Sequence, residues 1–147
     1  MADKDLHLGF HFKVEFTNFE GEFQFQSVSG LNVDLETETI AEGGENRFKH
    51  TLPVRTKYPN LTLKRALIVN SSLIDWCRKA IENFEINPTN LTVKLLNRNH
   101  EPVITWSIAH AWPVKWSVED LNAEESKVVI ESIELVYNYF NIIRNGN

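Results

Sequence analysis

The chain has 147 residues, with 15 basic and 20 acidic side chains, a formal net charge of −5 and a single cysteine. This length predicts one domain, the excess of acids disfavours direct nucleic-acid binding, and one cysteine excludes an internal disulfide. The charged N-terminus lacks the apolar core of a signal peptide, and no apolar run approaches the roughly 20 residues that span a bilayer. We therefore expect synthesis in the cytoplasm and no membrane segment.

The first 40 residues alternate between apolar and polar side chains. Phe10 to Phe16 predicts a half-buried strand, and Phe23 to Gln26 continues the pattern after a turn at Glu20-Gly21, so we expect an antiparallel hairpin. Gly30 interrupts the run. Leu31 to Ile40 then predicts a third strand, whose acidic outer face is formed by Asp34, Glu36 and Glu38.

The polar stretch from Ala41 to Asn60 is the one segment that invites a catalytic interpretation. His50 near Glu42 or Glu45 would suit a general base, but no nucleophile or metal cluster converges on it. Gly43-Gly44 lacks the spacing of a phosphate-binding loop. Since loops of this length in a compact domain are usually functional or disordered, we expect a long hairpin and not an enzyme site.

The middle of the chain predicts a strand followed by a helix. Leu61 to Val69 alternates until Arg65, where we expect a bulge. The helix should begin with Ser72 as its N-cap and end at Asn87-Pro88. Its apolar stripe recurs at spacings of three and four and must lie against a sheet: Leu73, Ile74, Cys77, Ala80, Ile81 and Phe84.

Three further strands are expected after the helix: "LTVKLLN", the long "PVITWSIAHAWPVKWSV" and "SKVVIESIELVYNYF". In the second, Pro113 must lie at an edge or a bend, and one parity forms an aromatic face: Ile104, Trp106, Ile108, Trp112, Val114 and Trp116. Strands, one helix and then strands predict a mainly β fold, an antiparallel sandwich or barrel with one flanking helix and a long hairpin.

Two other kinds of site are weakly supported. Five scattered histidines and no paired cysteines argue against zinc, and Cys77 on the apolar helix stripe is better interpreted as a small hydrophobe than as a nucleophile. We therefore expect no metal, cofactor or catalytic residue. Trp106, Trp112 and Trp116 leave open a carbohydrate-binding β-sandwich, which requires these rings to be exposed.

Several motifs in series resemble the tail tube proteins of contractile phages and the related tubes of extracellular contractile injection systems. "FQSVSGLNVDLETETI" is similar to the family's "F-x-x-V-S-G-L" strand-turn-strand, and "KYPNLTLKRA" to its "Y-x-N-I-T-L-K-R-G" strand. "LIDWCRKA" resembles its "F-x-x-W" helix. Asn90 to Phe140 resembles its closing strands, including "W-x-x-x-x-A-W-P" and "V-x-I-E-S-I-E-L". The resemblance extends from about Phe10 to Phe140.

The resemblance implies a structural protein whose hexameric rings stack into a hollow conduit for cargo inside a sheath. Its partners would be further copies of itself, the sheath, the baseplate and spike hub, and terminator proteins. It divides the single domain, residues 1–147, into an N-terminal arm (1–8), a long assembly hairpin (41–60) and a C-terminal tail (141–147). A tube-initiating ring, which joins the spike hub to the tube, remains an alternative.

The resemblance also assigns roles to two groups of charged side chains. Complementary charges on the hairpin would set the register between copies: Glu42, Glu45, Arg47, Lys49, Arg55 and Lys57. The acidic strand face of Asp34, Glu36 and Glu38 is a candidate for lining the channel, although an ordinary solvated strand face has the same pattern. Ala66, the "LPV" of 52–54 and the extended C-terminus depart from the family pattern.

Overall fold

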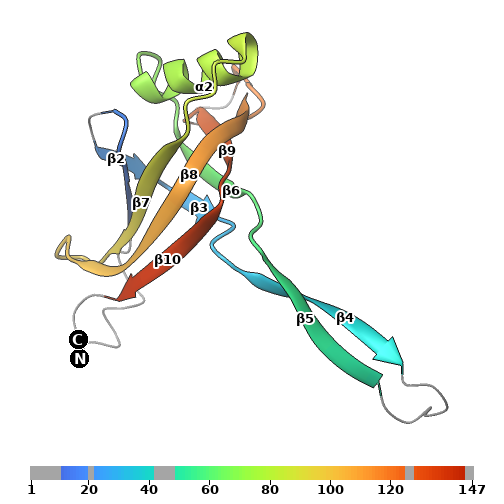
Figure 1. Ribbon diagram of the computed structural model, residues 1–147. Coiled ribbons are helices and arrows are strands. Elements are labelled where there is room, and N and C mark those ends of the chain that lie inside the picture. Colours follow the sequence, from blue (N-terminus) through green and yellow to red (C-terminus); the bar gives the residue numbers. More distant parts are fainter. Residues whose placement is uncertain (1–10, 20–21, 42–48, 125–127, 145–147) are drawn as a thin grey trace.

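The computed structural model describes residues 11–19, 22–41, 49–124 and 128–144. Antiparallel strands form a curved body, and a two-stranded hairpin projects from it (Figure 1). Across the described ranges, no helix is long and apolar enough to cross a membrane. The elements are β1 (His11–Phe16), β2 (Glu22–Phe25), β3 (Ser27–Ser29), β4 (Asp34–Ala41), β5 (Lys49–Lys57), β6 (Leu61–Ala66), α2 (Ser72–Asn83), β7 (Thr89–Leu96), β8 (Pro102–Val118), β9 (Ile130–Val136) and β10 (Tyr139–Arg144).

The strands of the body follow the order β2-β1-β7-β8-β9-β6-β3, and β10 pairs with β8 beside this path. The first half of β8 pairs with β7 and β10, whereas its second half pairs with β9. One long strand therefore joins the two parts of a barrel-like body. The expected antiparallel, mainly β fold with a flanking helix is confirmed, as is the β1–β2 hairpin.

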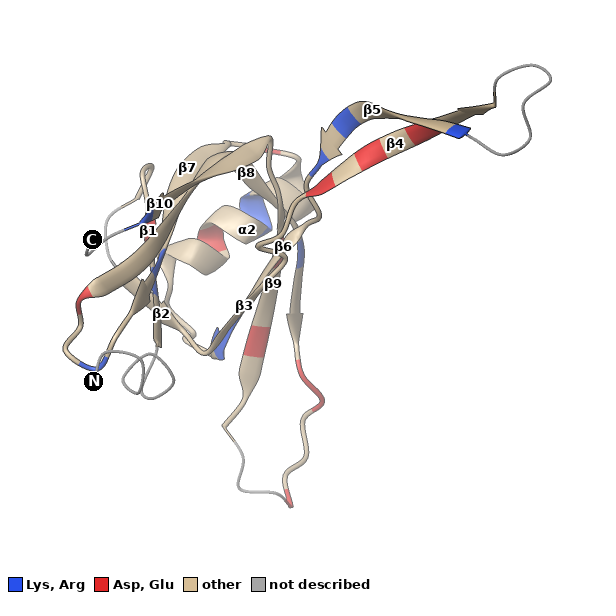
Figure 2. Cartoon of the chain, turned by 90° about the horizontal axis from the view of Figure 1, so that it is seen from below, with Lys and Arg blue, Asp and Glu red and all other residues tan. Residues whose placement is uncertain are grey.

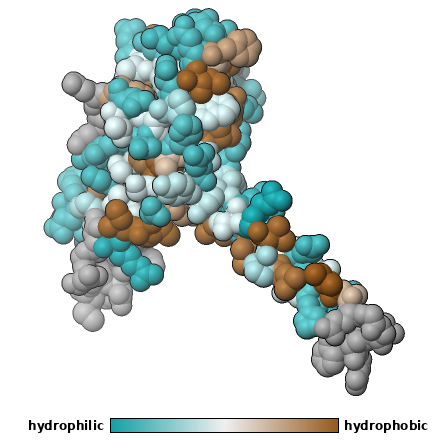
Figure 3. Space-filling model, viewed as in Figure 1, coloured by the Kyte–Doolittle hydropathy of each residue, from teal (hydrophilic) through white to brown (hydrophobic). Residues whose placement is uncertain are grey.

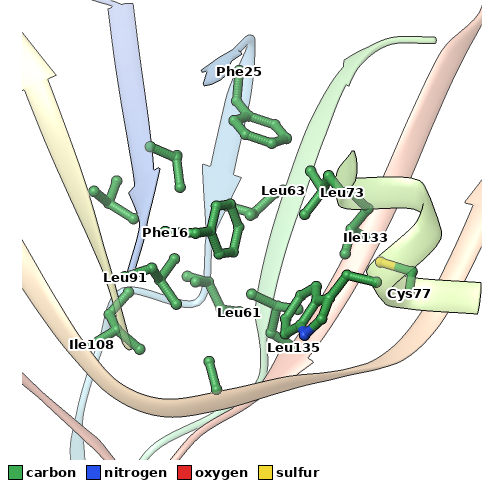
Figure 4. Close-up of a cluster of buried hydrophobic side chains, with 14 of the residues drawn as sticks. Phe16, Phe25, Leu61, Leu63, Leu73, Cys77, Leu91, Ile108, Ile133 and Leu135 are labelled. Carbon is green, nitrogen blue, oxygen red and sulfur yellow. The ribbon is translucent and has the colours of Figure 1, made fainter. Parts of the chain in front are cut away.

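The core fills the space between the curved strands and α2 (Figure 4). Alternation in β6 turns Leu61 and Leu63 inward, and alternation in β9 turns Ile133 and Leu135 toward them. Phe16, from β1, lies in the same cluster. Leu61, Leu63, Ile133 and Leu135 are inaccessible to solvent, so burial of these side chains packs the neighbouring strands β6 and β9 against the rest of the core.

The N-cap of the helix lies one residue earlier than predicted. Ser71, not Ser72, is the N-cap, because Ser71 is extended and its side chain accepts a hydrogen bond from the backbone N–H of Leu73. The predicted apolar stripe is also too long: Phe84 caps the C-terminus with a positive φ of 57° and is 85% exposed. Trp76, absent from that stripe, is buried instead, and its Nε1–H donates to the carbonyl of Asn87 at 2.9 Å.

Three other expectations need correction. No bulge occurs at Arg65, which pairs in regular register with Glu131. The projecting hairpin is longer than the predicted 41–60 stretch, because β4 already pairs with β5 from Asp34 onward. The C-terminal run divides into β9 and β10, and residues 141–144 of the expected tail continue β10 along β8. The expected N-terminal arm, 1–8, lies outside the described residues.

The uniform aromatic parity predicted for β8 is broken near its middle. His110 has a positive φ of 58°, and the register with β9 shifts between Pro113 and Lys115. Ile108 and Ala111, three residues apart, are therefore both buried. The predicted bend at Pro113 coincides with this irregularity, which lets β8 pass from one part of the body to the other.

Candidate assembly surface

The hairpin of β4 and β5, here called the arm, lies outside the core. The two strands pair only with each other, and every described residue of β5 is exposed. Apolar side chains nevertheless occur along it, including Leu35 at 59% exposure and Leu52 at 44%. Figure 3 shows these as brown patches along the projecting hairpin. An arm that exposes apolar surface without a core of its own is a candidate contact surface.

Contacts at the base of the arm fix where it leaves the body. Gly30 enters with a positive φ of 97°, and a Cβ at this position would lie 2.1 Å from the carbonyl oxygen of Asn60, where the chain returns. Next to this crossing, the ring of Tyr58 lies 5.1 Å from Phe140 and 5.9 Å from Tyr137, measured between centroids. Partial burial raises the pKa of Tyr137 to about 12. The arm is therefore anchored by a close backbone approach and by an aromatic cluster.

The register gives the arm two chemically different faces. Residues directly opposite in an antiparallel pair share a face, and a shift between Glu36 and Thr37 leaves Val54 as the extra residue of β5. The charged face carries all three described acids of the arm, and its residues are Asp34, Glu36, Glu38, Ile40, His50, Leu52, Arg55 and Lys57. The threonine face carries no described acid, and its residues are Leu35, Thr37, Thr39, Ala41, Lys49, Thr51, Pro53 and Thr56.

The structure places six of the nine predicted charged residues on the arm. Glu36 lies 3.1 Å from Arg55, so an expected channel residue is paired with an expected interface residue within one chain. Asp34 lies opposite Lys57 in the register. Such exposed ion pairs contribute only about 0–1 kcal/mol to folding, which leaves these charges available for other contacts. Glu42, Glu45 and Arg47 lie outside the described residues.

The remaining chemical candidates, His50 and Cys77, lie apart from each other in the described part of the chain. His50 lies on the charged face opposite Ile40. Cys77 is buried, and this burial raises the pKa of its thiol from 9.0 to about 12, so the nucleophilic thiolate is disfavoured. Within the described segments, no three His, Cys, Asp or Glu side chains are grouped so that they could hold a metal ion.

The three tryptophans on which the carbohydrate-binding alternative depends do not have fully exposed rings. Trp106, Trp112 and Trp116 are partly buried and pack against the core, whereas sugar stacking would need exposed ring faces. The Nε1–H of Trp116 donates to the buried Glu131 carboxylate at 3.1 Å. These rings therefore stabilise the body, and this arrangement argues against the carbohydrate-binding alternative.

Sequence reasoning missed a buried ion pair. Arg65 and Glu131 are 3% and 0% exposed, and Arg65 Nε lies 3.4 Å from Glu131 Oε2. The sequence contains the signal: Arg65 shares inward parity with Leu61 and Leu63, and Glu131 shares it with Ile133 and Leu135. Opposite charges at buried positions of two neighbouring strands indicate a pair that spans them.

The described residues form a mainly β body from which a two-stranded hairpin projects, and this is the fold of the tail tube class. The chain belongs to the T4-like virus tail tube protein gp19 family, whose model matches residues 8–141. This agrees with the extent of the resemblance found in the sequence. No curated protein sequence matches the chain.

Solved structures with this fold include components of injection machines. A chain of the anti-feeding prophage baseplate is 31% identical, with a TM-score of 0.80 and coverage of 92% of both chains. A chain of the PVC extracellular contractile injection system sheath–tube complex is 22% identical, with a TM-score of 0.77 and coverage of 90% of this chain and 88% of that one. A chain of the anti-feeding prophage tube-terminating cap is 21% identical, with a TM-score of 0.76 and coverage of 90% and 87%.

Proposed function

We propose that this protein is an inner tube subunit of a contractile injection system or phage-tail-like particle. Six copies form a ring, and rings stack into a hollow conduit for cargo. The observation that carries this proposal is the arm, which exposes apolar side chains outside the core. A two-stranded hairpin is at best marginally stable alone in water, so contact with another copy accounts for its presence.

The free edge of β10 supports lateral contact between copies. β10 pairs with β8 along one edge, and no other described strand pairs with it. Ile142 and Ile143 are about half exposed. An unpaired strand edge offers a row of backbone donors and acceptors to another chain, so a sheet continued from copy to copy accounts for ring closure.

The charged residues of the arm have two roles in this proposal. Lys49, Arg55 and Lys57, together with Glu42, Glu45 and Arg47, set the register between copies by charge complementarity. The acids Asp34, Glu36 and Glu38 face the channel. All three lie on the charged face of the arm together with Arg55 and Lys57, so these two basic residues would meet the neighbouring copy at the edge of the channel, whereas Lys49 lies on the opposite face, which is available for contact with protein.

The partners of the proposed tube are a sheath, a baseplate hub and a terminator. Support comes from the similar chains, which belong to a baseplate, a sheath–tube complex and a tube-terminating cap. The protein is made in the cytoplasm and then incorporated into the particle. Neither a cofactor nor direct sequence-specific binding of nucleic acid is part of this function.

A tube-initiating ring is the second candidate. It is favoured by the 31% identity to a baseplate chain, compared with 22% for the sheath–tube chain. In this role the protein would form a single layer between the spike hub and the tube, through the same lateral contacts between copies.

Negative-stain electron microscopy and mass photometry over a concentration series distinguish the two candidates. We expect hollow tubes or stacked rings above a critical concentration. Single rings that never stack, even at the highest concentration, would identify the initiating layer. A chain that stays monomeric both alone and with the baseplate of its own particle would contradict both candidates.

A further inference from the structure

The threonine face of the arm is suited to contact with an acidic partner surface. All three described acids of the arm lie on the opposite face. Lys49, at the far end of β5, is exposed and forms no ion pair with any described residue. Leu35, near the base of the same face, is 59% exposed. The threonine face therefore carries an exposed apolar side chain near the base, hydroxyl-bearing side chains along its length, and at the far end a lysine that pairs with no described acid.

A groove with complementary properties lies beside the connection between β8 and β9. Its volume is about 560 Å³, and its lining includes Glu119, Asp120, Leu121 and Val128. Leu121 is 74% exposed and Val128 is 66% exposed. Neither Glu119 nor Asp120 forms an ion pair with a described residue. The groove thus offers unpaired acids next to uncovered apolar side chains.

The arm and this groove lie on opposite sides of the molecule. In Figure 1 the arm leaves the lower part of the body, whereas the ends of β8 and β9 lie at the top near α2. Figure 2, seen from below, shows the arm leaving the body toward the upper right and the β8–β9 connection toward the bottom, with acidic residues coloured red on the connection. The arm cannot fold back onto the groove of its own chain.

We propose that the threonine face of one copy's arm docks in the β8–β9 groove of a second copy. Lys49 then lies against Glu119 and Asp120, and its neighbours on the same face, Ala41, Thr39 and Thr51, cover Leu121 and Val128. The eight residues of β4 span about 26 Å, long enough to reach past the edge of the body. Because the two surfaces differ, the contact is heterologous and repeats without closing on itself. This inference rests on the proposed tube function and names the surface that receives the arm.

Cysteine crosslinking in the assembled protein tests both the face and the groove. The variant Thr39→Cys/Leu121→Cys carries one cysteine on the threonine face and one in the groove. Under mild oxidation it should give a ladder of crosslinked copies on a non-reducing gel. The matched control, Glu38→Cys/Leu121→Cys, places the first cysteine on the charged face and should give at least about tenfold less product. Native Cys77 is fully buried and does not compete.

Charge reversal provides an independent measurement. Lys49→Glu should raise the critical concentration for assembly about tenfold, which corresponds to about 1.4 kcal/mol. Adding Asp120→Lys should restore most of this loss, because the pair is then reversed instead of broken. Circular dichroism should show that each variant monomer is folded, since both positions are exposed.

The outcomes separate this inference from the function on which it rests. Tubes that form in microscopy but crosslink through Glu38→Cys instead of Thr39→Cys would show that the wrong face was assigned. Tubes that crosslink through neither cysteine, with no rescue by Asp120→Lys, would overturn the groove as the receiving surface. Failure of the wild-type chain to form tubes or rings in any condition would overturn the proposed function, and this inference with it.

Discussion

At the scale of single residues, the buried Arg65–Glu131 pair organises the junction of strands and helix. The carboxylate of Glu131 accepts hydrogen bonds from Trp116 Nε1–H and from the backbone N–H of Ile68, both at 3.1 Å. Arg65 donates through Nη2 to Ser71 Oγ at 2.9 Å. Since Ser71 caps α2, the pair links β6, β8 and β9 to the start of the helix.

Neutralising one member of this pair should destabilise the body strongly. Glu131→Gln keeps the shape of the side chain but leaves the Arg65 charge buried and uncompensated, which costs about 3–5 kcal/mol. Urea denaturation measures the change in the free energy of unfolding. Glu15→Gln is the control, because Glu15 pairs with Lys13 and Lys94 on a partly exposed surface and its loss should cost less than about 1 kcal/mol. Equal effects of the two substitutions would contradict a special role for the buried pair.

The buried thiol of Cys77 predicts a loss of stability at alkaline pH. Burial, followed by the nearby Glu131 charge, raises the pKa of Cys77 from 9.0 to about 12. Above pH 9 the unfolded chain therefore releases a proton that the folded chain retains, and the free energy of unfolding should fall by at most about 1.4 kcal/mol per pH unit. Urea denaturation at pH 8, 9 and 10 checks this.

Cys77→Ala separates the thiol from other titrating groups in the same window. The variant should be less stable at every pH because of the cavity that it leaves, but its stability should decline less between pH 9 and 10. In the wild-type protein, the thiol should also react slowly with a maleimide at pH 8. Parallel pH profiles for the two proteins would show that Cys77 does not cause the decline.

At the scale of elements, the spacing of apolar side chains predicted the strands and the helix whose sequences follow one regular period throughout. β1, β2, β7 and most of β8 follow from one dry face and one wet face, and the apolar spacing of Leu73, Cys77 and Ala80 predicted α2. Errors arose where tertiary partners override a local pattern. Arg65 is tolerated in a regular strand because Glu131 faces it from β9, 66 residues away, and such a partner is invisible to a local window.

The candidate site was predictable in its location more than in its geometry. The polar stretch after Ile40 indicated a long hairpin, but the pairing of β4 with β5 depends on a register that composition alone does not determine. The interpretation of Asp34, Glu36 and Glu38 as one acidic face survives in the register. The ion pair between Glu36 and Arg55 of the same hairpin could be identified only from the structure.

Gly30 lies at the base of the arm, where the outgoing chain closely approaches the returning chain at Asn60. Gly30→Ala places a Cβ 2.1 Å from the backbone oxygen of Asn60 in a left-handed conformation. Since backbone must move to relieve this contact, we expect a loss of about 1–3 kcal/mol of folding stability. Thermal denaturation followed by circular dichroism measures it. Ser29→Ala, at the exposed neighbouring position, is the control and should change stability by less than about 0.5 kcal/mol; similar melting temperatures for the two variants would contradict the prediction.

At the scale of the whole molecule, the proposed docking of the arm in the groove of another copy would make assembly directional. A variant whose residues 34–57 are replaced by a short Gly-Ser linker keeps the groove but loses the arm. Because the arm adds no residue to the core cluster, this variant should fold with a melting temperature within a few degrees of wild type.

Mixed with wild type at about one part in ten, this arm-less chain should shorten the tubes, since each incorporated copy offers a groove and no arm to the next layer. Tube lengths in electron micrographs give the result, and the Glu15→Gln chain added at the same ratio is the control. Tubes of unchanged length that demonstrably contain the arm-less chain would contradict directional growth through the arm.

Because β8 pairs with β7 and β10 in its first half and with β9 in its second half, the ribosome must synthesise β8 and β9 before the body can be completed. The arm, residues 34–57, emerges long before Pro102–Val118, the strand that joins β7 to β9. The groove residues, within 119–122 and 128–130, emerge later still. A nascent chain therefore cannot close its body, or present both mating surfaces, until about nine-tenths of it has been translated. In the proposed tube, the order of the strands along the chain would therefore delay polymerisation until translation is nearly complete.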